Sequence, residues 1–278
     1  MTDVPPLSES TAERLWLVEK LVLGWLMLVL ALDPAWTRLP QAWTLLNDGA
    51  GASPGAFASA LGALRLAAVG GAAAAFAGAA RAVLLPFVAG AFLLLSWASQ
   101  SLGGAVWNYN LHLAWFLVLL RVADVGASPA AARARTLSLM QLAVALFYLQ
   151  SGLSKLVGSG AWWFLEGTAI HHYAPTLGTA LGRLLAGQPG LCRCVGLATG
   201  VLEFALPVLL LVPRTQRLAA VAAWGFHAGV FLVFGIGFWQ LQILYVALFF
   251  RAPALAMHRL LAAPPPGPVR PATQLSLP

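Results

Sequence analysis

Long apolar runs recur along the whole chain and constrain its fold more than any other feature. A helix needs about 20 apolar residues to cross the hydrocarbon layer of a bilayer, because unpaired backbone groups cannot be left in lipid. Of the 278 residues, 60% are hydrophobic and only 9% are charged, which is about a third of the charged fraction of soluble domains. These observations predict an all-α fold: a polytopic helical membrane bundle.

Eight apolar runs are counted as transmembrane helices. They cover residues 15–32, 57–80, 82–99, 105–122, 136–156, 194–212, 217–236 and 238–250. The last run has about 13 residues, so it is expected to be tilted, half-inserted or continuous with its neighbour. The expected organisation is an N-terminal segment at 1–14, a membrane domain at 15–251 and a proline-rich, disordered tail at 252–278.

Lys and Arg residues indicate the orientation, because cytoplasmic loops retain positive charge. With the N-terminus inside, the cytoplasmic side collects 11 of the 16 basic residues: Arg14, Lys20, Arg81, Arg121, Arg133, Arg135, Arg214, Arg217, Arg251, Arg259 and Arg270. Both termini are then cytoplasmic, and residues 157–193 form a loop on the outer face. The first apolar run has no small-residue cleavage site, so it is expected to stay attached.

Several classes of function are disfavoured by the composition. The net charge is +7, but the basic residues are scattered at the ends of apolar runs and do not form the basic patch of a nucleic-acid-binding protein. Cys192 and Cys194 make neither a disulfide framework nor a four-ligand zinc site, and are interpreted as small helix-end residues. His171 and His172 are adjacent, hence about 100° apart on a helix, so no metal site is predicted.

Four ionisable residues are expected at membrane depth: Lys155, Glu203, His227 and Arg65. Such a group costs roughly 2.5–3.5 kcal/mol on insertion scales, so it usually faces a cavity or a partner. Lys155 is either an anchor that extends to the interface or a base that works near neutral pH. His227 is either a neutral core histidine or a group that transfers protons or binds a ligand. Glu203 is expected to pair with Arg65, Lys155 or His227, or to be protonated.

Further polar residues are expected near Lys155 on the outer side. Asn110 and His112 lie within about two turns of the outer end of the fourth run. Trp163 belongs to the interfacial stretch AWWFLEGTAIHHY, where tryptophan prefers the headgroup level. The fourth to seventh runs are therefore expected to form a polar-lined centre.

Three segments resemble the horizontally transferred transmembrane (HTTM) family, which includes the membrane domain of vitamin K-dependent γ-carboxylase. The hallmark segment of that family is matched in order by Gln141, Tyr148, Gly152, Lys155, Leu156, Trp163 and Gly167. WNYNLH at 107–112 and GFHAGVFLVFGIGF at 225–238 are similar to two further family segments.

The resemblance implies a reduced quinone of the vitamin K type as cofactor. Lys155 would be the base that activates it, and His112 and His227 would line its pocket. The histidine of WNYNLH stands one residue later than in the family, so Asn110 is an alternative match for His112. We add Trp163, Glu203 and Arg65 as candidates for binding the cofactor.

Two functions are therefore expected for an integral protein of the bacterial inner membrane. The first is a quinol-dependent oxidoreductase or peptide-modifying enzyme, carboxylase-like or epoxidase-like, with its site open to the periplasmic or extracellular side. The second is a non-catalytic maturation or export factor for a secreted antimicrobial peptide, acting beside a partner protein. A transporter is disfavoured, because the chain has no charged stripe or paired broken helices.

Overall fold

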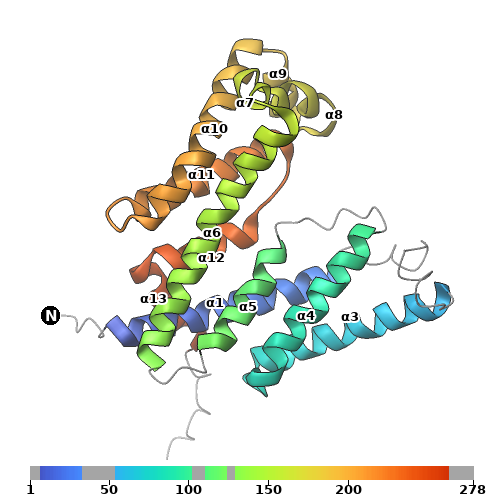
Figure 1. Cartoon of the computed structure of the whole chain (residues 1–278), viewed down its shortest axis with the longest axis vertical. Coiled ribbons are helices and arrows are strands. Elements are labelled where there is room, and N and C mark those ends of the chain that lie inside the picture. The colour runs from blue at the N-terminus through green and yellow to red at the C-terminus, as the bar shows by residue number, and fades with distance from the viewer. Residues whose placement is uncertain (1–6, 33–53, 102–109, 124–128, 263–278) are drawn as a thin grey trace, which may run out of the picture.

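The computed structural model describes residues 7–32, 54–101, 110–123 and 129–262, and these residues are almost entirely helical (Figure 1). No strand occurs among them, so the predicted all-α class is confirmed. The elements in chain order are α1 Leu7–Leu32, α3 Pro54–Phe76, α4 Arg81–Ser101, α5 Leu111–Ala123, α6 Pro129–Ser159, α7 Trp162–Leu165, the π-helix η3 Ala169–Tyr173, α8 Ala174–Leu177, α9 Ala180–Ala186, α10 Pro189–Leu211, α11 Gln216–Phe234, α12 Trp239–Phe249 and α13 Arg251–Ala262.

Six helices in the described part of the chain are long and apolar enough to cross a membrane. They are Ser10–Leu32, Ala58–Phe76, Arg81–Ser99, Pro129–Ser159, Pro189–Leu211 and Gln216–Phe234. The eight-span prediction is thus reduced to six, or to seven if the broken pair α12 and α13 is one span. The fourth and eighth predicted runs do not reach this length among the described residues: α5 has 13 residues, and α12 has 11 and is followed by a 106° bend.

Helix α6, with 31 residues, connects two parts of the molecule. Figure 1 shows it running from the group formed by α1, α3, α4 and α5 up to α10 and the short helices α7 to α9. It packs against α1, α5, α10 and α12, and one apolar core runs through these helices. Side chains on one helix therefore reach both parts of the fold.

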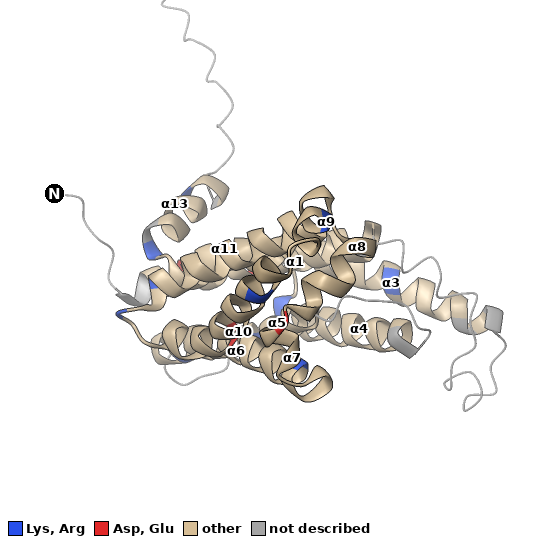
Figure 2. Ribbon diagram, turned by 90° about the horizontal axis from the view of Figure 1, so that it is seen from above, with Lys and Arg blue, Asp and Glu red and all other residues tan. Residues whose placement is uncertain are grey.

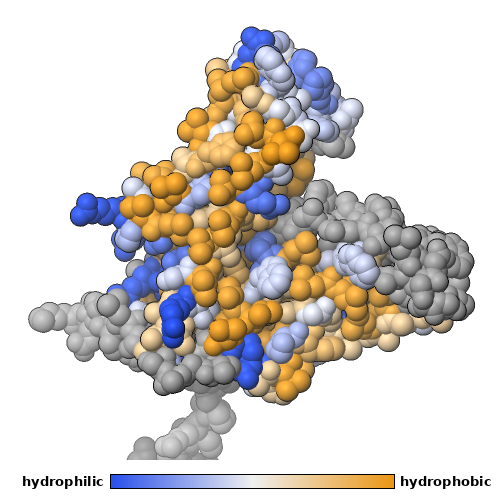
Figure 3. Space-filling model, in the orientation of Figure 1, coloured by the Kyte–Doolittle hydropathy of each residue, from blue (hydrophilic) through white to orange (hydrophobic). Residues whose placement is uncertain are grey.

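The alanine- and glycine-rich stretch of α3 forms a close helix contact, as its small residues predict. Ala68, Ala72 and Ala75 are fully buried, and a Cβ added to Gly71 would lie 3.2 Å from the Phe87 ring of α4. The outer faces of the long helices are apolar and exposed, for example at Val201 of α10. Figure 3 shows apolar side chains over much of this face, and Figure 2 shows only scattered charged residues. Such surfaces suit contact with lipid.

Helices at both ends of the described chain extend beyond the predicted membrane domain. Helix α1 already begins at Leu7, and α13 covers the first part of the tail that was expected to be disordered from 252. The Trp16 ring packs at 4.8 Å from the ring of His258, and Ala254 is fully buried. The prediction relied on the prolines that follow residue 263, which lie outside the described residues, and it missed the apolar side of α13.

Candidate functional site

Residues 160–188, expected as an outer loop, form a compact helical cap on α10 and α11. Gly167 adopts φ +61°, and a Cβ there would lie 2.0 Å from the carbonyl oxygen of Cys192. A Cβ at Gly196 would lie 2.4 Å from the carbonyl oxygen of Phe164. Because only glycine permits these backbone approaches, α7 rests directly on α10. The Thr179 backbone N–H donates to the carbonyl of Val233 at 3.0 Å and ties the cap to α11.

Under this cap, α6, α10 and α11 enclose a cavity of about 1010 Å³. Most of its wall is apolar or aromatic, with Phe147 from α6, Phe164 and Trp163 from the cap, and Phe226 from α11. Lys155, Ser151 and Tyr148 of α6, Glu203 of α10 and His227 of α11 also line it. An amine, a carboxylate and an imidazole from three helices thus share one apolar-walled space.

Lys155 pairs with Glu203. Lys155 was one of the three partners that the sequence analysis considered for this carboxylate. The Lys155 Nζ donates to Glu203 Oε1 and, at 2.9 Å, to Ser151 Oγ, which itself donates to Glu203 Oε1 at 3.2 Å. The Glu203 side chain is 1% exposed and that of Lys155 is 26% exposed. Gly152 allows the close approach of α6 to α10 here, since an added Cβ would lie 3.3 Å from Glu203 Cβ. The positive charge of Lys155 is therefore paired with a carboxylate inside the protein.

His227 belongs to a second polar cluster, with two tyrosines. Its Nε2 lies 2.8 Å from the Tyr148 hydroxyl and 3.2 Å from the Tyr245 hydroxyl, and the two hydroxyls bond to each other. If Nε2 accepts a hydrogen bond, one tyrosine hydroxyl donates to Nε2 and the other donates to the first hydroxyl, so both hydroxyl hydrogens are bonded within the cluster. The ring proton of a neutral His227 then resides on Nδ1. Phe238 packs against the imidazole with ring centroids 4.7 Å apart.

The two clusters lie along one face of α6. Tyr148, Ser151 and Lys155 are separated by three and four residues, the spacing that places side chains on the same side of a helix. Tyr148 and Lys155 are therefore about 10 Å apart along the helix axis. A single elongated molecule in the cavity could reach both clusters.

Each cluster contains a buried polar atom that lacks a hydrogen-bond partner among the described residues. These atoms are Glu203 Oε2 and His227 Nδ1. Buried polar atoms in folded proteins are nearly always bonded, so unpaired ones require a reason. Both belong to residues of the cavity wall.

The other predicted site residues lie outside the cavity wall. His112 is buried behind Phe147, with ring centroids 5.5 Å apart, and neither of its nitrogens has a partner among the described residues. Asn110 Oδ1 accepts from Trp25 Nε1 at 3.2 Å, which links α5 to α1. Arg65 donates to the carbonyl oxygens of Leu30 and Ala31 at the end of α1. Of the seven candidates, Lys155, Glu203, His227 and Trp163 are brought together, and these three are not.

Three polar residues at the site were missed as site residues. Ser151 precedes Lys155 by one helical turn, so helix periodicity was a usable signal. Tyr148 belongs to the segment that resembles the HTTM family, but only the fold brings its hydroxyl to His227. Tyr245 stands in a uniformly apolar stretch of α12, and no local pattern in the sequence marks it.

Neither a metal site nor a comparison with known proteins assigns a function to this cavity. Within the described residues, no group of three or more His, Cys, Asp and Glu side chains is placed to hold a metal ion. Comparisons with models of known families, with curated proteins and with solved structures find no match. The cavity and the motif residues in its wall are consequently the features of the molecule that bear on its function.

Proposed function

We propose that this chain is a quinol-dependent enzyme of the bacterial inner membrane, related to the HTTM family, which modifies a secreted peptide at its outer face. One observation carries the proposal: a single large, apolar-walled cavity has the Lys155–Glu203 pair and the tyrosine-bonded His227 in its wall. Under this proposal both termini are cytoplasmic, and the peptide reaches the cap from outside.

The residues of the cavity fit a reduced quinone. Its volume of about 1010 Å³ is at the upper end of the range of about 300–1,000 Å³ for small-molecule sites, which leaves room for an apolar tail. Aromatic side chains such as Phe226 and Trp163 suit a flat ring. Two polar residues of the wall can recognise its hydroxyl groups: the Glu203 carboxylate as an acceptor and the His227 imidazole as a donor.

A bound quinol supplies two electrons and two protons. The Lys155–Glu203 pair can accept the first proton in two ways. Glu203 can take it directly at Oε2, or Lys155 can pass its own proton to Glu203 and accept another at Nζ. The second route gives Lys155 the role of base that the resemblance implies. A protonated, paired amine cannot act as a base, so Lys155 requires Glu203 for this role.

His227 has a positioning role in the proposal. Tyr148 and Tyr245 hold Nε2 as an acceptor, so a neutral ring presents Nδ1–H to an oxygen of the ligand. The apolar residues of the wall lower the local polarity around both polar clusters, which strengthens their interactions with a bound molecule. His112, behind Phe147, would act only through that ring.

The second candidate function is a non-catalytic maturation or export factor for a secreted peptide, working with a partner protein. The Lys155–Glu203 contact favours it in one respect, since an ion pair between α6 and α10 is also a purely structural device. In that case the cavity would hold lipid or a segment of the peptide, and the protein would bind no quinol.

The proposal is tested by the binding of menadiol, a soluble reduced naphthoquinone, to purified protein in nanodiscs. Ligand at about 100 times its dissociation constant should stabilise the wild type by about 2.7 kcal/mol, measured as a rise in the unfolding temperature. Ala198→Trp adds bulk at a residue of the cavity wall that belongs to neither polar cluster. This variant should lose the stabilisation.

The matched control is Leu197→Trp, at a neighbouring exposed residue that does not line the cavity. It should respond to menadiol as the wild type does. An absence of stabilisation in the wild type, or equal stabilisation of the Ala198→Trp variant, would reject quinol binding in this cavity. Recovery of a stoichiometric partner protein together with that negative result would favour the maturation factor.

A further inference from the structure

A second pocket lies near the opposite end of α6 from Lys155. It has a volume of about 230 Å³ and is lined by residues of α1, the α3–α4 turn, α4, α5 and α6. Its apolar wall includes Leu15, Trp16 and Leu120. Its charged residues are Glu19, Lys20, Arg81 and Arg133. None of them takes part in the function proposed above.

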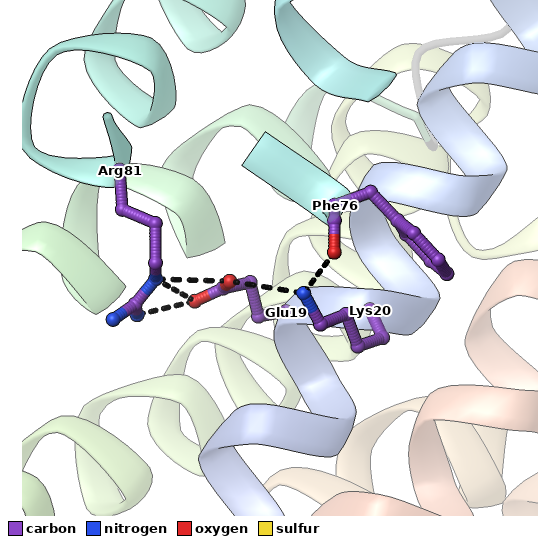
Figure 4. Close-up of polar contacts among 4 residues, drawn as sticks. All are labelled: Glu19, Lys20, Phe76 and Arg81. Atoms are coloured by element: carbon purple, nitrogen blue, oxygen red, sulfur yellow. Dashed lines mark hydrogen bonds and ion pairs between the residues drawn. The ribbon is translucent and has the colours of Figure 1, made fainter. Parts of the chain in front are cut away.

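Glu19 organises the charged side of this pocket. Its carboxylate is 2% exposed and accepts both from Arg81 Nε, at 3.0 Å, and from Arg81 Nη2. Figure 4 shows the Glu19 carboxylate between Arg81 and Lys20, whose Nζ lies 3.9 Å from Glu19 Oε1 and donates to the Phe76 carbonyl. The arginine is thus matched by the carboxylate in a bidentate pair, which fixes α4 against α1.

Positive charge exceeds negative charge in the described lining of this pocket. Three cations and one carboxylate give 3 − 1 = +2. Lys20 has three N–H donors; one donates to the Phe76 carbonyl, and Nζ lies 3.9 Å from Glu19 Oε1, beyond hydrogen-bond distance. Arg133, exposed on α6, has no hydrogen bond or ion pair with other described residues. Two donors from two helices therefore face a small pocket that contains no second described acid.

We propose that this pocket binds the phosphate headgroup of an acidic membrane phospholipid. Basic pockets between transmembrane helices hold such headgroups through charge-assisted hydrogen bonds. Lys20 belongs to a candidate membrane span, so the pocket lies beside lipid. The apolar side chains of Leu15, Trp16 and Leu120 suit the glycerol and upper acyl carbons, and the small volume suits a headgroup alone.

The test measures how dihexanoyl phosphatidylglycerol stabilises the purified full chain in a neutral detergent. It should raise the unfolding temperature of the wild type, whereas dihexanoyl phosphatidylcholine should not. Arg133→Gln and Lys20→Met should each weaken the apparent affinity about fivefold, the contribution of one basic residue at an acidic lipid surface. Arg135→Gln is the matched control, because Arg135 also lies exposed on α6 but, within the described part of the chain, bonds only to Ala131 of its own helix.

The outcomes separate the lipid from its alternatives. Equal affinities in the Arg133→Gln, Arg135→Gln and wild-type proteins would overturn the proposal, since binding would then follow general surface charge. If inorganic phosphate stabilises the wild type as strongly as the lipid, the phospholipid is rejected in favour of free phosphate. Should Lys20→Met fail to fold, Arg133→Gln decides alone, because Arg133 is exposed and has no described partner to lose.

Discussion

At the scale of single residues, a lysine in a membrane helix can lower the cost of its charge in two ways: it extends to the interface, or it pairs with an anion inside the protein. Lys155 takes the second way, with Glu203 and Ser151 as partners. The pairing leaves the carboxylate dependent on the lysine, because Glu203 is almost fully buried and the amine is not. Removing one partner should thus be worse than removing both.

Lys155→Met should destabilise the fold by about 3 kcal/mol, at the low end for breaking a buried pair because the lysine is partly exposed. The double change Lys155→Met with Glu203→Leu should recover most of this loss, since no unpaired charge remains. Denaturation of all four proteins in one detergent measures the coupling as a double-mutant cycle. Additive effects of the two changes would show that the pair contributes nothing.

Tyr245→Phe should cost about 1–3 kcal/mol, because it removes a hydroxyl that bonds to both Tyr148 and His227 in a buried cluster. Tyr173→Phe is the control, since Tyr173 is half exposed, and it should change stability by less than about 0.5 kcal/mol. Thermal unfolding monitored by circular dichroism compares the two. Similar effects of both substitutions would contradict the hydrogen-bonded cluster.

At the scale of elements, the position of the cap over the cavity depends on glycines. Gly167 and Gly196 let the backbone of α7 approach that of α10, and Phe164 packs over Gly200 with its ring 2.9 Å from an added Cβ. Thr179 fixes the other side of the cap to the end of α11. The roof of the cavity is consequently positioned by backbone contacts at both of its edges.

Gly196→Ala should destabilise the protein by about 1–3 kcal/mol, because the new methyl group would overlap the Phe164 carbonyl. Gly190→Ala on the same helix meets nothing within 4 Å and should be neutral or stabilising by up to about 1 kcal/mol. Unfolding temperatures, together with menadiol binding, report on the fold and the cavity. A neutral Gly196→Ala would mean that α7 does not rest on α10 in this way.

The sequence predicted the helical class and part of the site, and each limit has a physical cause. Helix identity follows from apolar runs, but an apolar run does not mark where a helix begins and ends, and α5 and α12 are shorter than the runs that contain them. Lys155, Glu203 and His227 were found because charge and imidazole are conspicuous in apolar helices. Tyr245 was not, because a tyrosine resembles its apolar neighbours until the fold supplies a partner. Arg65 was expected near the site, but it donates to backbone carbonyls at the end of α1, which can bind a guanidinium as a carboxylate would.

At the scale of the whole molecule, α6 connects two polar sites that lie near its opposite ends. Residues of its C-terminal half line the large cavity, and Arg133 of its N-terminal turns lines the small basic pocket. If the basic end faces the cytoplasm, as the positive charges predict, the cavity and cap face the outside. The orientation of the chain in the membrane therefore decides which side of the membrane the cavity faces.

A membrane-impermeant maleimide should label Cys194, which is exposed and lines the cavity, from the outer side of intact cells. Cys194→Ser should remove the labelling, and Cys192→Ser should keep it, because Cys192 is buried. Labelling that requires broken cells would reverse the predicted topology, with both termini outside.

The most direct measurement is photo-crosslinking of the nanodisc-embedded protein with a reduced azido-naphthoquinone, followed by mass-spectrometric mapping of the labelled peptides. The proposed function predicts label within residues 147–155, 163–181, 194–203 and 226–238, the four segments that wall the cavity, and predicts that excess menadiol removes it. Label confined to the lipid-facing sides of α3 and α4, or unaffected by menadiol, would contradict a quinol site between Lys155 and His227.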